Sequence, residues 1–170
     1  MRLVPTPVVS QLTGLSTEKL REWTSRRALI PADVRPKQRG SPAQFSWQTI
    51  LILRLAVLLR DQFAVELQSY KKAFATLRKE LRSTSFIALW GRCLAFGPQG
   101  GVLLEEGSPL VGVDAIFIRL NPHLEAIRDG FSLPDAAAAA MQLDLFSLAS
   151  MQGSQKDAKR LISSNRRQSA

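Results

Sequence analysis

The chain has 170 residues with 45% apolar content, enough for one domain or two small ones with a hydrophobic core. Its net charge of +9 indicates an anionic partner. A single cysteine, Cys93, and a single histidine, His123, exclude an intramolecular disulfide and a histidine-rich metal site. No metal or cofactor is therefore expected. No signal peptide or transmembrane stretch stands out, so we expect a cytoplasmic protein.

Residues 8–30 predict two short helices joined by a tight turn. Gly14 can adopt the positive φ of that turn, and Ser16 is a suitable N-cap for the second helix. Leu20 and Trp23 share one helical face and are expected to pack on the first helix. The pattern favours a helix-turn-helix whose second helix enters the major groove of DNA. The alternative is a helical hairpin that only packs.

Within this stretch the sequence reads VSQLTGLS at 9–16, LREW at 20–23 and LIP at 29–31. These residues resemble the start of a MerR-type winged-helix DNA-binding domain. Phe45, followed by Ser46 and an apolar helix, resembles that family's step from wing to third helix. The resemblance covers roughly residues 5–80 and implies a winged helix-turn-helix that binds double-stranded DNA.

The sequence departs from the family pattern at three positions. Ala28 stands where the family usually has glycine, and Glu22 replaces a common aromatic residue. Ala43 stands where an arginine usually precedes the second aromatic residue of the wing. The departures at Glu22 and Ala43 bear on the family's phosphate contacts.

Residues 32–44 contain several turn-forming residues and predict a hairpin-like wing. Arg35, Lys37 and Arg39 alternate along it, so an extended chain would place them on one face. Such a face suits phosphates or the minor groove. The alternative is a solvated basic loop.

Ser46 is the next N-cap, and the helix that follows it is apolar on nearly every side, which predicts a central core helix. A second long helix is expected from residue 63 to about residue 82. Its apolar residues form a heptad seam. We expect a homodimer across this seam, and the alternative is packing on the preceding helix. The residues assigned to dimerisation are Leu67, Tyr70, Phe74, Leu77 and Leu81.

Residues 83–131 predict a small α+β unit. Short apolar runs at 86–90, 94–96, 102–104 and 116–120 are typical of three or four strands of a small, largely antiparallel sheet. Asn121 and Pro122 then predict the start of a helix. The unit could bind an effector, hold a partner or extend the dimer. It shows no convergence of catalytic groups, and we do not expect an enzyme.

Residues 132–152 begin as an alanine-rich helix or spacer and end in a pentapeptide that resembles the bacterial sliding-clamp-binding motif. The pentapeptide is Gln142, Leu143, Asp144, Leu145 and Phe146. The resemblance implies a peptide that inserts apolar anchors into a groove of the clamp. The alternative is a terminal amphipathic helix packed on the body of the protein. Residues 153–170 are polar and basic, and we expect a tail without a core.

The predicted fold is thus mainly α with a small β portion. It comprises a winged helix-turn-helix (1–62), a dimerisation helix (63–82), an α+β unit (83–131), a spacer with the clamp-like motif (132–152) and a basic tail (153–170).

The predicted function is that of a sequence-specific bacterial transcription regulator. The alternatives are a DNA-binding adaptor of replication or repair, tethered to the sliding clamp, and an excisionase-like architectural factor. The residues expected to contact DNA are Ser16, Thr17, Lys19, Arg21, Glu22, Ser25, Arg35, Lys37 and Arg39.

Overall fold

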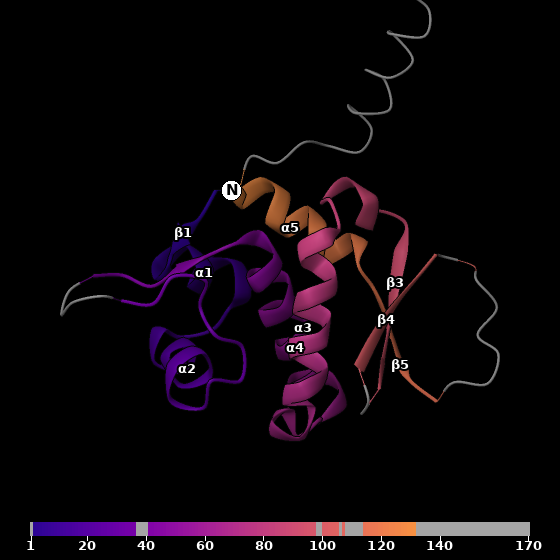
Figure 1. Cartoon of the computed structure of the whole chain (residues 1–170), viewed down its shortest axis with the longest axis horizontal. Helices are drawn as coiled ribbons and strands as arrows, with labels where there is room; N and C mark the ends of the chain where they lie inside the picture. Colours follow the sequence, from indigo (N-terminus) through magenta and orange to yellow (C-terminus); the bar gives the residue numbers. More distant parts are fainter. Residues whose placement is uncertain (1, 37–40, 98–99, 106, 108–113, 132–170) are drawn as a thin grey trace, which may run out of the picture. The chain divides into compact units, whose positions relative to one another are not determined.

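The computed structural model describes residues 2–36, 41–97, 100–105, 107 and 114–131. The chain divides into two units, residues 1–133 and 134–170, and all described residues belong to the first. The described part is mainly helical with two small antiparallel sheets, which confirms the predicted fold class at this level (Figure 1).

The N-terminal part contains the predicted pair of helices. After the short strand β1 (Val4–Pro5), helix α1 (Thr6–Thr13) ends at Gly14, whose φ of 72° confirms the left-handed turn. Helix α2 (Thr17–Arg21) is capped by Ser16, whose hydroxyl accepts a hydrogen bond from the backbone N–H of Lys19 at 3.2 Å. The helix continues without a break into a π-helical turn, η1 (Glu22–Arg26).

A hairpin base connects this pair to the central helix. Val34 pairs with Gln44, and strand β2 (Gln44–Phe45) pairs antiparallel with β1. Residues 37–40, at the tip of this connection, lie outside the described part. Helix α3 (Trp47–Phe63) then begins after its predicted cap, because the Ser46 hydroxyl accepts a hydrogen bond from the N–H of Thr49.

Helix α3 is the core element that the sequence predicts. Its residues from Trp47 to Leu53 are all buried, as are Leu55, Ala56 and Leu59. An apolar helix of this kind requires neighbours on several sides. It contacts α1, α4 (Lys71–Ser83) and α5 (Asn121–Phe131), and Figure 1 shows it among them.

The expected continuous helix from residue 63 to 82 is wrong. Helix α3 ends at Phe63, and Ala64 takes a left-handed conformation with φ 51° that reverses the chain. A short 3₁₀ helix, η2 (Leu67–Tyr70), then leads into α4. Phe63, the last residue of α3, is 47% exposed.

The rest of the seam is an internal contact of the chain. Leu67, Phe74, Leu77 and Leu81 are between 0 and 7% exposed. The rings of Tyr70 and Phe74 stack on Phe96, with centroids 5.3 and 5.2 Å apart. In this conformation the five residues assigned to dimerisation pack within the chain.

Strands β3 (Arg92–Gly97), β4 (Gly100–Glu105) and β5 (Ile116–Arg119) form the predicted antiparallel sheet in the order β4-β3-β5. The expected strand at 86–90 is wrong. This run contains a 3₁₀ turn, η3 (Ile87–Leu89), in which the N–H of Ala88 donates to Ser85 Oγ at 3.3 Å, and Phe86 packs edge-on against Trp47, with ring centroids 5.2 Å apart.

The sheet and α5 share one hydrophobic core with the N-terminal helices. Buried side chains of the sheet and of α5 belong to the same cluster as those of α1, α2 and α3. Helix α5 contacts α3 and α1, and β4 contacts α4. The segments predicted as 1–62, 63–82 and 83–131 are therefore parts of one folded unit.

Candidate nucleic-acid interface

The segment formed by α2 and η1 has a buried face and an exposed polar face. Leu20 and Trp23 are 1% and 3% exposed, as the sequence predicts, and the Thr24 hydroxyl donates to the carbonyl of Leu20 at 2.7 Å. This packing holds the segment in place, so its opposite face stays at the surface. The predicted contact residues that are exposed on that face are Ser16, Thr17, Arg21 and Ser25.

Two further predicted contact residues, Lys19 and Glu22, are held by ion pairs. The Glu22 carboxylate accepts from Lys19 Nζ at 2.9 Å and from Arg27 Nε at 2.8 Å. The hydrogen bond from Lys19 is the main cause that lowers the pKa of Glu22. Exposed pairs of this kind are weak, so a phosphate could replace the carboxylate. Glu22 therefore orients two cations in addition to any contact of its own.

The segment of α2 and η1 ends in two backbone features that helix propensities did not predict. The N–H of Arg27 donates to the carbonyl of Glu22 at 2.8 Å, five residues back, which is the π-helical pattern. Ala28 then has φ 45°, a left-handed conformation. At this position the MerR-type pattern usually has glycine. A left-handed backbone favours glycine, which explains that preference. Arg26 and Arg27, which were not selected from the sequence, are exposed here.

An aspartate and an arginine that the sequence did not single out hold the hairpin base. Asp33 Oδ2 accepts from the N–H of Ser46 and its Oδ1 from Arg78 Nη2, each at 2.7 Å. Arg78 Nη1 also donates to the carbonyl of Pro31 at 2.7 Å. This cluster of Asp33, Arg78 and the Ser46 N–H, here called the hairpin latch, fixes the hairpin base to α3 and α4.

The electrostatics of the latch agree with its geometry. Burial by itself would raise the pKa of Asp33. The hydrogen bonds from the Ser46 N–H and Thr49, together with Arg78, outweigh burial and lower this pKa. Asp33 is therefore held as an anion between two donors. Sequence patterns gave no indication of the pair, because 45 residues separate its members.

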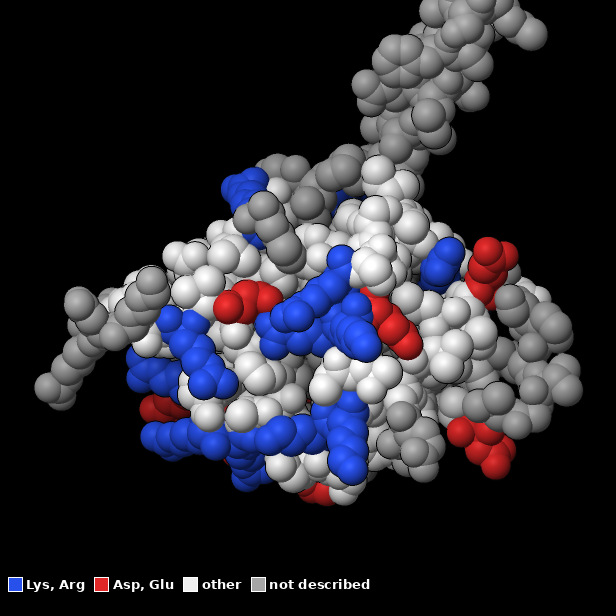
Figure 2. Space-filling model, viewed as in Figure 1, with Lys and Arg blue, Asp and Glu red and all other residues white. Residues whose placement is uncertain are grey.

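Arg35 is exposed beyond the latch, whereas Lys37 and Arg39 lie outside the described residues. The clamp-like pentapeptide, Gln142 to Phe146, also lies outside them. On the surface, Lys and Arg gather over the helical part of the face shown in Figure 2, and Asp and Glu are more frequent toward the sheet. The basic excess of the first half of the sequence thus lies largely on the helices.

His123 on α5 lies in a largely buried environment. It is 9% exposed, and burial lowers its pKa to about 4, with a further contribution from the neighbouring charge of Arg54. Arg54 itself donates to the carbonyl of Leu12. Cys93 is half-buried on β3.

No protein-family model matches the chain, and no match was found among the curated proteins. None of the helices in the described part is long and apolar enough to cross a bilayer.

Proposed function

We propose that the protein is a sequence-specific DNA-binding protein of the winged helix-turn-helix type and acts as a transcription regulator. The observation that carries the proposal is the exposed face of α2 and η1. This face presents Arg21, Ser25 and Arg26 to solvent while the opposite face is locked into the core. A helix supported in this way can enter the major groove without losing its own packing.

Two neighbouring features support the proposal. The hairpin base, which holds the exposed Arg35, is fixed by the hairpin latch close in sequence to the end of η1. A basic hairpin there can contact phosphates beside the groove that receives the helix. Phosphate contacts would fix orientation, and polar side chains such as Thr17 and Ser25 would contact base edges.

The proposal includes a homodimer, because helix-turn-helix proteins commonly bind two half-sites one helical turn apart. The heptad residues of α4 are buried within the chain, so the dimer contact would use another surface.

The test compares two arginines with the same charge change. Arg21→Gln should weaken binding to every duplex by a similar factor, because a phosphate contact carries no sequence information. Arg119→Gln, on β5, removes the same charge from the sheet and should leave binding unchanged. Equal losses in the two variants, measured by fluorescence anisotropy, would show that only net charge matters and would reject α2 as the contact surface.

The second candidate is a DNA-binding adaptor tethered to the sliding clamp. The observation that favours it is the agreement of all five positions, Gln142 to Phe146, with the clamp-binding pattern. DNA binding would then serve to hold the adaptor near the clamp. A pull-down from a bacterial lysate separates the two, since the clamp should be captured only by the adaptor.

A further inference from the structure

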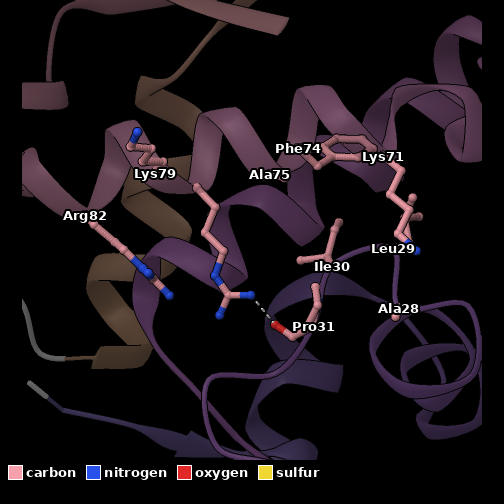
Figure 3. Close-up of a pocket in the computed structure, with 10 residues that line it drawn as sticks. Ala28, Leu29, Ile30, Pro31, Lys71, Phe74, Ala75, Lys79 and Arg82 are labelled. Atoms are coloured by element: carbon pink, nitrogen blue, oxygen red, sulfur yellow. Dashed lines mark hydrogen bonds between the residues drawn. The ribbon is translucent and has the colours of Figure 1, made fainter.

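A hollow of about 260 Å³ lies between α4 and the segment that follows η1 (Figure 3). Its lining is mostly apolar and includes Leu29, Ile30, Phe74 and Ala75. Its volume is slightly below the range common for small-molecule sites. The hollow is therefore large enough for one ring system or a short alkyl chain.

The polar lining of this hollow is entirely cationic among the described residues. Lys71, Arg78, Lys79 and Arg82 line it, and no Asp or Glu does. Arg78 is already paired with Asp33, and Lys71 donates to the carbonyl of Arg27 at 3.2 Å. Within the described part, neither Lys79 nor Arg82 has a hydrogen bond or an ion pair, so their donors are free to bind an anion.

A second hollow of about 280 Å³ adjoins the first through Arg78 and Arg82, which line both. Its other lining residues are Asp33, Ser46, Gln48 and Thr49. Gln48 is 8% exposed, yet its Oε1 has no hydrogen-bond partner among the described residues. A buried amide without a partner is uncommon, and rotation of the amide would present an N–H donor instead.

We propose that the two hollows form a binding site for a small organic acid with an apolar body. The apolar body would lie against Ala28, Pro31 and Ala75, the apolar lining residues that are not buried, and the carboxylate would be held by Arg82 and Lys79. Charge-assisted hydrogen bonds of this kind are stronger than neutral ones, so the carboxylate should contribute most of the selectivity.

The proposed site shares Arg78 with the hairpin latch. A carboxylate bound beside Arg82 lies next to the Arg78 guanidinium and competes with Asp33 for it. Arg78 also donates to the carbonyl of Pro31, a hydrogen bond drawn as the dashed line at Pro31 in Figure 3, and the bound acid would compete with this contact too. Binding of the acid would therefore change how firmly the hairpin base is held. This regulatory consequence rests on the proposed function, whereas binding of the acid does not.

The test uses 2-naphthoate as the probe and its neutral analogue 2-naphthalenemethanol, titrated into the full chain by calorimetry. We expect 2-naphthoate to bind at least tenfold more tightly than the alcohol. The double variant Lys79→Gln/Arg82→Gln should lose at least tenfold in naphthoate affinity. Lys72→Gln, on the same helix but outside both hollows, should bind as the wild type does. Ala75→Leu, which fills the floor from an exposed position, should abolish binding.

Three results would overturn the proposal. Equal affinity for the acid and the alcohol would mean that the naphthalene ring alone is bound and that there is no carboxylate site. An equal loss in Lys72→Gln and in the double variant would mean attraction by net charge. Absence of naphthoate binding, together with weaker duplex binding in the double variant, would assign these cations to DNA phosphates. Thermal melts of each variant establish that it is folded, so loss of binding is not mistaken for unfolding.

Discussion

Ala28 and Ala64 hold backbone conformations that alanine rarely adopts, with φ of 45° and 51°. The left-handed region costs an L-residue about 1–2 kcal/mol relative to the right-handed one, and glycine avoids most of this cost. Ala28 ends the η1 turn and directs Leu29 and Ile30 into the core, so its conformation is imposed by the packing on both sides.

Replacing Ala28 with glycine should therefore stabilise the protein. The gain should be about 0.5–1 kcal/mol, since glycine relieves the strain but loses more entropy on folding. Urea unfolding followed by circular dichroism measures it. Ala75→Gly, within the regular helix α4, is the control and should destabilise by about 1 kcal/mol. A loss of stability in Ala28→Gly would show that the backbone of Ala28 is not strained.

His123 makes the stability depend on pH. Its pKa is about 4 in the folded chain, below its ordinary value of 6.5, because burial disfavours the charged ring. Above pH 6.5 both folded and unfolded forms are neutral, so this group has no effect there. As the pH falls from 6.5 toward 4, only the unfolded form gains the proton, and stability is lost.

The expected loss from His123 between pH 7.5 and pH 5 is about 2 kcal/mol in the free energy of unfolding. The His123→Gln variant, which does not titrate, should lack this part of the pH dependence even if it is less stable throughout. Urea midpoints of the two proteins at both pH values give the comparison. Parallel pH profiles would mean that the histidine is not the titrating group.

Among the elements, α4 shows what periodicity can and cannot predict. The 3-4 spacing of Phe74, Leu77 and Leu81 indicated one apolar face, and this face exists. It could not indicate what covers the face, because the covering residue Phe96 comes from β3. A seam that suits a second helix suits a sheet equally well, so the dimer assignment did not follow from the spacing.

Capping residues predicted where helices begin. Apolar runs predicted less well whether a segment is a helix or a strand. The caps Ser16 and Ser46 begin α2 and α3 as expected, since each requires only a hydroxyl near its own helix. The apolar run at 86–90 has no period that separates a strand from a short helix, and it was assigned wrongly. The Asp33–Arg78 pair depends on tertiary folding alone.

The segment 132–152 carries the element-scale test of the adaptor hypothesis. If the clamp-like motif is a ligand, replacing Leu145 and Phe146 with Ala should abolish clamp binding and leave the melting temperature unchanged. If the segment is a core helix, the same double substitution should destabilise the protein by several kcal/mol. A thermal melt beside a clamp-binding assay separates these opposite outcomes. Wild-type protein that fails to bind the clamp would end the adaptor hypothesis.

At the scale of the whole molecule, the distribution of charge agrees with the proposed function. Residues 1–82 carry 15 Lys or Arg against 6 Asp or Glu, whereas residues 83–150 carry 3 against 7. The sheet and α5 lie in the second group, although they share the core of the first. Within the first unit, residues 83–131 carry 3 Lys or Arg against 5 Asp or Glu, so the strong basic excess lies on the N-terminal helices, which would orient the molecule toward DNA by these helices.

The most direct measurement is the salt dependence of binding to a duplex selected from a random pool, compared with an unselected duplex. Each phosphate neutralised contributes a slope of about −0.9 in log affinity against log salt. Contacts from Arg21, Arg26 and the basic hairpin predict a slope steeper than about −3 and clear preference for the selected duplex. Equal affinity for both duplexes, or a slope near zero, would contradict the proposal that the face of α2 and η1 binds DNA specifically.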